Sequence, residues 1–370
     1  MRGALDSIEL SLVRKLSEKC NSGTLRLGLG EPQSPLGEEL RDLFIKQMEK
    51  PITIYSPTDG LPALKSELSE LYRKEFGKEN LSICVTTGSM QALYMTLGAC
   101  SEPGEGILAV EPRYPGYASL FQLFGLKPTY VQRGMDGRLP AEELLEAIDD
   151  DTRYILLNSP NNPTGCIDSR DDLEHLFSGL ANTGIKVILD EVYYGFAAAE
   201  FYSPFSYPNT ILIRGISKTY GLTGFRLGWV ATDDDELASR LKKFQQNINT
   251  CPNTIVQYFT LELLRDDRGR TEYLNSLFLR GRDLARNFCL SKGLKAYPMD
   301  GAFYSYISLD KTRYQNRSLE FGTDLLEQEN VLVVPGISFT PETDNYFRIN
   351  ILLEEAVLNE AFGRISKLLF

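Results

Sequence analysis

Between about residues 80 and 230, short apolar runs alternate with segments of helical periodicity, and this alternation constrains the fold more than any other feature. The apolar runs have the length of strands and little polar alternation, which is typical of strands buried on both faces of a sheet. Helices between such strands favour parallel connections. The sequence therefore predicts an α/β fold with a mainly parallel sheet flanked by helices, with strands at 81–86, 106–110, 154–157, 186–189, 210–213 and 227–231.

The two ends of the chain have a different pattern. Near the C-terminus we expect strands at 302–307, 331–334 and 346–351, with helices at 317–328 and 353–370. The N-terminal part holds one predicted helix and then an extended segment at 25–35, which we expect to pack with the C-terminal part. A chain of 370 residues is longer than one hydrophobic core usually serves. We therefore predict a large domain over residues 41–280 and a smaller α+β domain formed by 1–40 and 281–370.

Composition excludes several classes of partner. The formal net charge is −11, from 50 acidic and 39 basic residues, which argues against nucleic acid as a partner. The six cysteines form no C-x-x-C pair, so we expect free thiols and no metal site. No apolar run is long enough for a signal peptide or a membrane span. We expect a cytoplasmic protein with no membrane partner.

The chain has a single histidine, His175, inside a helical pattern. Catalytic triads, histidine-ligated metals and histidine general bases need a histidine beside a cleft. His175 has no motif around it, so a helix-surface or packing role is expected. The chemistry must then use lysine, tyrosine, aspartate, arginine or a cofactor.

One segment suits cofactor chemistry especially well. Ser217 and Lys218 are followed by Arg226 in the run SKTYGLTGFRLGW. A lysine amine can form a Schiff base with an aldehyde cofactor, and a nearby guanidinium can bind the phosphate of that cofactor. By itself, the segment also fits a strand, a turn and a second strand that carry two cations.

A second possible phosphate site follows the strand predicted at 81–86. Gly88, Ser89 and Met90 lead directly into a predicted helix, where backbone amides and the Ser89 hydroxyl can bind an anion. The alternative is a glycine turn followed by an N-cap serine.

Two loops follow further strands at the edge where α/β proteins bind ligands. Tyr114 lies between Pro112 and Pro115, and its ring can either stack on a flat cofactor or simply pack in the loop. Asn162 lies in the run NSPNNPTG, whose turn residues restrict the backbone strongly. Its amide can reach a ring oxygen or a substrate carboxylate.

Asp190 ends the apolar run at 186–189, and a buried carboxylate there requires a partner. A protonated pyridine nitrogen is such a partner, and Tyr193 can bond a phenolic oxygen on the same ring. The alternative is an aspartate that caps the next helix.

Over essentially its whole length, the chain resembles fold-type I pyridoxal-phosphate enzymes of the class I/II aminotransferase family, the type of aspartate aminotransferase. The motifs that carry the resemblance are Gly30-Glu-Pro, Tyr55 before Gly60-Leu-Pro-Ala-Leu-Lys65, Gly88-Ser-Met90, the Tyr114 loop, Asn162-Pro-Thr-Gly165, Asp190-x-x-Tyr193, Ser217-Lys218, Arg226, Gly301-Ala-Phe-Tyr304, Pro335-Gly336 and Phe347-Arg-Ile-Asn350. The resemblance implies a seven-stranded large domain, a smaller domain built from both termini, and transfer of an amino group from an L-amino acid to a 2-oxo acid in a ping-pong cycle.

The resemblance also implies a role for each site residue. Lys218 binds pyridoxal 5′-phosphate and shuttles the proton between the substrate α-carbon and C4′, while Asp190 pairs with the pyridine nitrogen. The remaining roles are these: Tyr193 and Asn162 hold the 3′-oxygen, Tyr114 stacks on the ring, Ser89, the Met90 amide, Ser217 and Arg226 bind phosphate, and Arg348 binds the substrate carboxylate with Asn162 and the Gly30 amide. Tyr55 reaches the phosphate in the neighbouring subunit of a homodimer with shared active sites.

Several points stay open in the sequence. A β-eliminating lyase or a cyclising synthase would use the same motifs, whereas an α-oxoamine synthase would stack a histidine and a cofactor-sensing regulator would carry a DNA-binding extension. Gly215 stands where many relatives have a serine, so one phosphate contact is in question. Arg113 is a candidate for binding a second substrate carboxylate. Four aromatic side chains are candidates to line the cavity, and they favour substrates with larger apolar or aromatic side chains. They are Tyr55, Tyr114, Tyr304 and Phe339.

Overall fold

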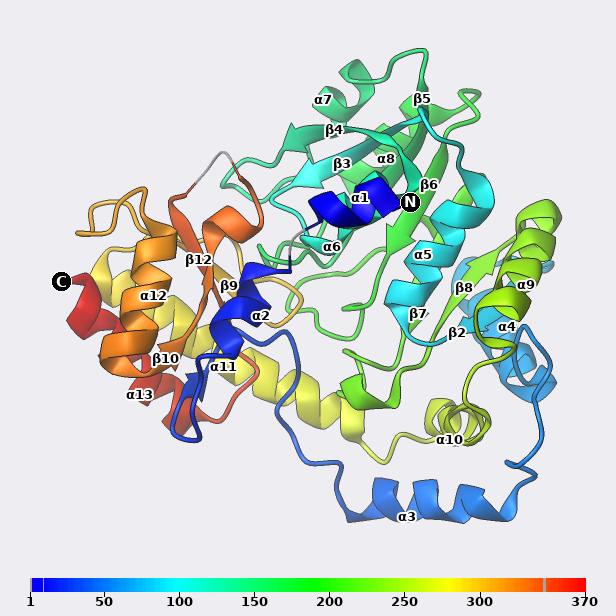
Figure 1. Ribbon diagram of the computed structural model, residues 1–370, viewed down its shortest axis with the longest axis horizontal. Coiled ribbons are helices and arrows are strands. Elements are labelled where there is room, and N and C mark those ends of the chain that lie inside the picture. Colours follow the sequence, from blue (N-terminus) through cyan, green and yellow to red (C-terminus); the bar gives the residue numbers. More distant parts are fainter. Residues whose placement is uncertain (1, 9, 342–343) are drawn as a thin grey trace.

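The computed structural model describes residues 2–8, 10–341 and 344–370, and a seven-stranded sheet forms its centre (Figure 1). From edge to edge the strands are β2 (Ser82–Thr86), β8 (Gly228–Thr232), β7 (Thr210–Gly215), β6 (Lys186–Asp190), β5 (Thr152–Asn158), β3 (Gly106–Glu111) and β4 (Lys127–Gln132). The five strands from β7 to β4 are parallel, and β8 is antiparallel to both of its neighbours. The predicted α/β fold with a mainly parallel sheet is therefore confirmed.

Sequence reasoning missed the strand β4 at the edge of this sheet. Its first three residues are exposed, and its sequence, KPTYVQ, has no continuous apolar run. An edge strand pairs with only one neighbouring strand and is less covered than a central strand. It therefore needs fewer apolar side chains. The helical patterns of the sequence predict helices near 90–100, 115–124, 169–182, 235–247, 252–265 and 269–291, but they do not predict α3 (Glu38–Lys46), α4 (Pro62–Phe76) or α7 (Ala141–Glu146).

Helices cover both faces of the sheet. One apolar cluster joins Val187 and Leu189 of β6 to α4, α7, α8 (Arg170–Leu180) and α10 (Thr254–Arg265). The other joins Ile188 to α5 (Ser89–Cys100), α6 (Gly116–Phe124) and α9 (Asp235–Asn249). Successive side chains of a strand point to opposite faces, so a run with no polar position is buried on both sides.

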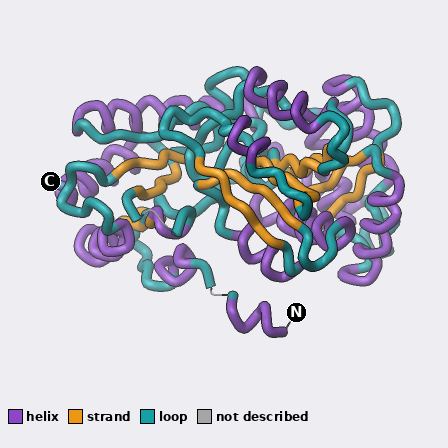
Figure 2. The backbone as a smooth tube through the Cα atoms, turned by 90° about the horizontal axis from the view of Figure 1, so that it is seen from above, coloured by secondary structure: helices purple, strands orange, loops and turns teal. Residues whose placement is uncertain are grey.

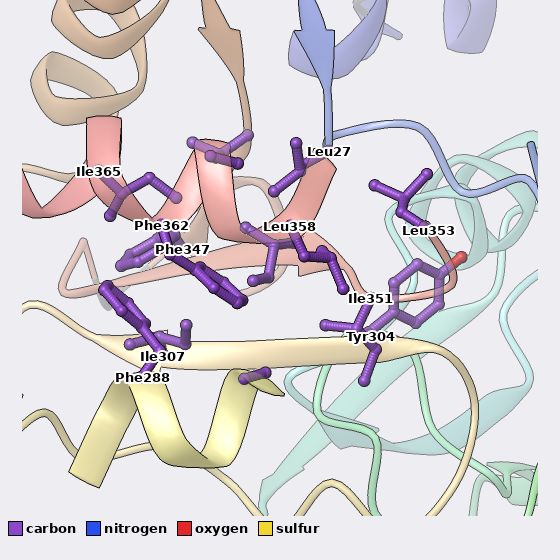
Figure 3. Packing of buried hydrophobic residues seen from close by; sticks show 14 of the residues in the cluster. Leu27, Phe288, Tyr304, Ile307, Phe347, Ile351, Leu353, Leu358, Phe362 and Ile365 are labelled. Atoms are coloured by element: carbon purple, nitrogen blue, oxygen red, sulfur yellow. The ribbon is translucent and has the colours of Figure 1, made fainter. Parts of the chain in front are cut away.

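A smaller sheet lies beside the large one. The strands β11 (Val334–Pro335), β12 (Tyr346–Asn350) and β9 (Tyr304–Ser308) pair antiparallel. They pack against α11 (Arg270–Lys292), α12 (Ser318–Glu329) and α13 (Glu355–Leu369). Figure 3 shows this core, in which the rings of Phe288 and Phe362 stack with centroids 4.6 Å apart. The predicted domain limit at residue 280 falls inside the continuous helix α11. No break in the chain marks this limit, so it stays a prediction.

The N-terminal segment joins this smaller part of the molecule. Two short helices, α1 (Arg2–Ser7) and α2 (Leu12–Ser17), replace the single predicted helix, and Figure 2 shows α1 projecting from the body. The strand β1 (Leu25–Arg26) pairs in parallel with β10 (Val331–Leu332), so the two ends of the chain lie side by side as predicted. Four 3₁₀ turns complete the elements: η1 (Gln47–Glu49), η2 (Pro204–Ser206), η3 (Thr223–Phe225) and η4 (Gly336–Ser338). Within the described residues, we find no helix with the length and apolarity needed to cross a membrane.

The packing of α11 against the smaller sheet yields a test. A Cβ atom at Gly281 would collide with the backbone oxygen of Ile351, so Gly281→Ala must move α11 or that strand end. We expect destabilisation of roughly 1–3 kcal/mol or more, measured by urea unfolding. Gly363→Ala in α13 is the matched control, since its Cβ meets no atom within 4 Å and alanine favours a helix by about 1 kcal/mol. Equal stability of the two variants would contradict the tight packing.

Candidate active site

The carboxyl ends of several strands of the large sheet meet at one cavity. Asn158 ends β5, Asp190 ends β6, and Ser217 and Lys218 follow β7 (Figure 1). Because β8 is antiparallel to both β2 and β7, the end of β2 reaches the same edge and delivers Ser89 there. The cavity has a volume of about 690 Å³.

The cavity brings together all of the predicted site residues except one. The residues that line it include Gly30, Ser89, Met90, Tyr114, Asn162, Asp190, Tyr193, Ser217, Lys218, Arg226 and Arg348. The exception is Tyr55, which lies in the loop before α4 and is 81% exposed. Its side chain faces solvent rather than the cavity of its own chain.

Asp190 is the buried carboxylate of the site, with an exposed fraction of 4%. Its Oδ2 accepts a hydrogen bond of 2.6 Å from the Tyr117 hydroxyl, and its Oδ1 lies 3.4 Å from the Val192 amide. Burial raises the pKa of Asp190 to about 6, although these two hydrogen bonds favour the ionised form and oppose the rise. The carboxylate is thus held ready for a cationic partner.

Tyr117 is a site residue that sequence reasoning missed. It lies on α6, three residues after Tyr114, and the two rings meet edge to face with centroids 5.4 Å apart. Its nearness in sequence to Tyr114 was the available signal, but Tyr117 also fits a residue of the apolar core, since it is 2% exposed. Only the position of α6 next to β6 brings its hydroxyl to Asp190.

Lys218 faces the cavity from the loop after β7. Its Nζ donates a hydrogen bond of 2.5 Å to the backbone oxygen of Gly30, which belongs to the N-terminal segment. Burial, together with the positive charges of Arg348 and Arg226, lowers the pKa of Lys218 to about 8. More of the amine is therefore neutral near pH 7 than in an ordinary lysine, and the neutral form is the one that acts as a nucleophile or a base.

Arg226 and the start of α5 form a seat for an anion. Arg226 has a left-handed backbone with φ of +54°, and its Nη1 donates to Ser217 Oγ at 3.3 Å and to the Thr223 backbone oxygen at 2.9 Å. A Cβ at Gly88 would collide with this guanidinium, so a glycine is needed there. The N-cap of α5 is Gly88 and Ser89 is the first helical residue, so Ser89 is not an N-cap serine. The first amides of the helix point towards the same place.

Gly215 is explained by close backbone packing. A Cβ there would lie 2.9 Å from the Cα of Gly228 and 2.9 Å from the backbone oxygen of Leu227. A Cβ at Gly228 would in turn lie 2.7 Å from the Ser89 amide nitrogen. A serine at position 215 has no room unless β8 moves away.

On the other side of the cavity, a chain of hydrogen bonds fixes Arg348. Its Nη1 donates to Asn162 Oδ1 at 2.8 Å and its Nη2 donates to the Gly28 backbone oxygen at 2.8 Å. The Asn162 amide lies 3.3 Å from the Tyr193 hydroxyl, which lies 2.9 Å from that of Tyr304. The Nε of Arg348 is buried and has no protein partner among the described residues.

Two other residues lie away from the cavity. Arg113 forms an ion pair with Glu111 and stacks over the Tyr130 ring at 3.9 Å, so the suggestion that it binds a second substrate carboxylate is wrong. His175 is exposed on α8, 2.8 Å from Glu142, which confirms its expected surface role. Of the aromatic residues expected in the cavity, Tyr114, Tyr304 and Phe339 line it.

The raised pKa of Asp190 predicts a stability effect of its charge in the cofactor-free protein. Folding raises this pKa from 3.8 to about 6, so the folded state loses stability as pH rises through that window, by up to about 3 kcal/mol. Asp190→Asn removes the charge, so above pH 6 we expect the variant to be more stable than the wild type. The difference should shrink as pH falls from 7.5 to 5, as measured by urea unfolding.

The exposed Asp150→Asn variant is the control, for which we expect no comparable pH-dependent gain. If Asp190→Asn destabilised the cofactor-free protein equally at both pH values, the burial cost assigned to this carboxylate would be wrong.

The chain matches known proteins over nearly all of its length. A sequence model of the family "Aminotransferase class I and II" matches residues 22–365. The aspartate aminotransferase of Pyrococcus abyssi is 32% identical, with 100% of this chain and 98% of that protein covered. The aromatic-amino-acid aminotransferase 2 of Thermococcus litoralis is 30% identical, with 99% and 97% covered. The solved aromatic aminotransferase of Pyrococcus horikoshii has a TM-score of 0.87 and 31% identity, with 96% and 98% covered.

These relatives are all named aminotransferases, and their family is known to use pyridoxal 5′-phosphate. The rival reactions of elimination and cyclisation are not favoured by any of these names. The chain belongs to the class I and II aminotransferase family and is a fold-type I enzyme that transfers amino groups.

Proposed function

We propose that this aminotransferase holds pyridoxal 5′-phosphate in the cavity and moves an amino group from an L-amino acid to a 2-oxo acid. The observation that carries the proposal is the convergence of Asp190, Lys218, Arg226 and Arg348 on one cavity from three separate segments, of which the loop between β7 and β8 supplies both Lys218 and Arg226. Each is the type of group that one part of the cofactor or substrate requires. Their spread over the chain makes a chance assembly improbable.

The residues fit this cofactor by two independent features. The seat formed by Gly88, Arg226 and the start of α5 suits a phosphate, because a glycine leaves space beside the guanidinium and the helix amides point outward. Ser89, the Met90 amide and Ser217 complete this seat in the proposal. Asp190 lines the same cavity as Tyr114, and its carboxylate suits the cationic nitrogen of a pyridinium ring.

When bound, the cofactor supplies an electron-withdrawing ring that stabilises negative charge on the substrate α-carbon. Asp190 keeps the ring nitrogen protonated, and the hydrogen bond from Tyr117 keeps Asp190 ionised and oriented. Tyr114 covers one face of the ring. Tyr193 and Asn162, already 3.3 Å apart, hold the ring's 3′-oxygen between them.

Lys218 carries the proton transfer in this proposal. Its pKa of about 8 leaves a useful fraction of neutral amine near physiological pH. The Lys218 amine would take the proton from the substrate α-carbon and return it at C4′ of the bound cofactor. The Gly30 oxygen, 2.5 Å away, keeps the amine on this side of the cavity.

Arg348 binds the substrate α-carboxylate. Its two Nη atoms are held by Asn162 and Gly28, and the Tyr304 ring lies 4.2 Å from its Cζ, so the guanidinium is fixed in direction. A fixed planar guanidinium binds a carboxylate with two hydrogen bonds at low entropic cost. The Asn162 side chain and the Gly30 amide assist it.

The enzyme works as a homodimer in this proposal, in the cytoplasm, with large and small domains divided near residues 40 and 280. Tyr55 reaches the cofactor phosphate of the other subunit. In support, Tyr55 is 81% exposed and lies close in sequence to Ile54 and Met48, which are 64% and 63% exposed. Large apolar side chains exposed together are typical of a protein interface.

Lys218→Ala tests the central assignment. We expect turnover to fall by at least about 10³-fold and the visible absorption of the lysine-bound cofactor to disappear, since no other amine would be bonded to it. Borohydride reduction of the wild type, followed by peptide mass analysis, should find the cofactor attached to Lys218. Lys127→Ala, an exposed lysine, is the control and should keep both signals. A label on any other lysine would refute the role.

Arg348→Gln separates substrate binding from cofactor binding. We expect KM for both the amino acid and the 2-oxo acid to rise by roughly 10–100-fold, because a charged two-point contact is lost. The visible spectrum of the bound cofactor should not change. A variant with unchanged KM, or one that cannot hold the cofactor, would contradict the assignment of Arg348 to the α-carboxylate.

A further inference from the structure

Tyr304 begins the strand β9, and its hydroxyl group lies at the cavity. The side chain is fully buried and belongs to the residues that line the cavity. Figure 3 shows its ring at the edge of the apolar core of the smaller part of the molecule, with the hydroxyl oxygen at the outer end. A Cβ at Gly30 would lie 2.7 Å from this oxygen, so the N-terminal segment passes close to it and a glycine is needed there.

The hydrogen bonds of Asn162 fix the direction of one contact of Tyr193. A guanidinium only donates, so Arg348 Nη1 requires that the side-chain oxygen of Asn162 faces it, at 2.8 Å. The amide nitrogen of Asn162 then faces the Tyr193 hydroxyl at 3.3 Å, and an amide nitrogen is a donor. Tyr193 therefore accepts this hydrogen bond and keeps its own proton for another partner.

The Tyr193 proton has two possible acceptors, the Tyr304 oxygen at 2.9 Å and a ligand in the cavity. Tyr193 is the only hydrogen-bond partner of the Tyr304 hydroxyl within the described residues. If Tyr193 donated to Tyr304, the Tyr304 proton would be buried without an acceptor among these residues, which costs free energy. If Tyr304 donates instead, its proton is paired and the Tyr193 proton is free for the cavity.

The proposed cofactor offers a better acceptor than a phenol. Burial raises the pKa of both Tyr193 and Tyr304, so both hydroxyls keep their protons near neutral pH. The 3′-oxygen of the cofactor is negatively charged when deprotonated, and a hydrogen bond to a charged acceptor is stronger than one to a neutral oxygen. A hydroxyl that accepts hydrogen bonds is also a stronger donor, because hydrogen bonds in a chain polarise one another.

We infer that Tyr304 is a positioning residue of the reaction: its hydroxyl donates to Tyr193 and so directs the Tyr193 proton to the 3′-oxygen of the cofactor. The inference rests on the proposed function and deepens it, since Tyr304 acts through Tyr193 and not on the reacting atoms. The ring of Tyr304 also lies 4.2 Å from Arg348 Cζ. One side chain thus contacts the groups proposed for the cofactor and for the substrate.

Tyr304→Phe removes the hydroxyl and keeps the ring, so it tests the hydrogen bond alone. The visible absorption of the lysine-bound cofactor changes with pH when the proton beside the 3′-oxygen is lost, and a donor to this oxygen favours the deprotonated form. In Tyr304→Phe that donor is weakened. We therefore expect the midpoint of the spectral pH titration to rise by roughly 0.3–1 pH unit, the range of one neutral hydrogen bond.

A double substitution shows whether Tyr304 acts through Tyr193. Tyr193→Phe removes the direct donor and should raise the midpoint by more than Tyr304→Phe does. The double variant should titrate like Tyr193→Phe alone, because the Tyr304 hydroxyl then has no proton to direct. Tyr306→Phe is the matched control, since it removes another buried hydroxyl of β9, one that lies 3.4 Å from the Gly336 backbone oxygen. It should titrate like the wild type.

Cofactor affinity gives a second readout. Above the midpoint, we expect Tyr304→Phe to raise the dissociation constant of pyridoxal 5′-phosphate by roughly 2–10-fold, as measured by absorbance titration of the cofactor-free protein. Below the midpoint the change should be smaller, because a protonated 3′-oxygen gains less from the donor. A merely structural effect of the substitution would weaken binding equally at both pH values.

Three results would overturn the inference. An unchanged or lower midpoint in Tyr304→Phe would show that Tyr193 does not depend on this donor. A further rise in the double variant, beyond that of Tyr193→Phe, would mean that Tyr304 acts on the cofactor directly. An equal rise in Tyr306→Phe would reduce the effect to the packing of β9. Failure of the proposed function is distinguishable, because the wild type would then show no lysine-bound cofactor to titrate.

Discussion

The site depends on one buried charge, the carboxylate of Asp190 at the end of β6. Its two oxygens are served by a tyrosine hydroxyl and a backbone amide, and no ion pair reaches it within the described residues. Such a group is costly to bury without a cation, and its raised pKa expresses that cost. In the protein alone, the site is therefore strained electrostatically. In the proposal, the pyridinium nitrogen pairs with the Asp190 carboxylate and offsets the cost of burying its charge. The same ion pair then favours cofactor binding and keeps the ring nitrogen protonated.

The fold places this carboxylate where charges of the opposite sign can meet it. Parallel strands end at one edge, and the reversal at β8 brings the start of α5 to the same edge. The smaller sheet contributes Arg348 to the cavity, and the N-terminal segment contributes Gly30. Lys218, Arg226 and Arg348 line the cavity together with two carboxylates, the buried Asp190 and Glu31. The positive groups of the cavity attract an anionic substrate.

Much of the fold could be predicted because the central strands are buried on both faces, and their apolar runs are visible in sequence. The edge strand β4 and the helices α3, α4 and α7 could not, since half-exposed elements carry a weaker pattern. Asp190, Lys218 and Asn162 lie at or just after the ends of strands. The sequence pattern therefore predicted them as site residues. Tyr117 was not predicted, because a tyrosine on an apolar helix face looks like core until its neighbour is known. The ion pair that occupies Arg113 was not visible in the sequence either, because whether Glu111 reaches Arg113 depends on how the loop is packed.

The sequence by itself determined the kind of protein: an α/β fold, a lysine among small residues for cofactor chemistry, and the motifs of an aminotransferase family. These are local properties, written in periodicity, turn residues and spacing. The tertiary structure alone decided which groups touch. It set the hydrogen bond from Tyr117 to Asp190 and the absence of space for a side chain at Gly215. Such contacts join residues from separate elements, and the burial and charge around them arise only when the chain is packed.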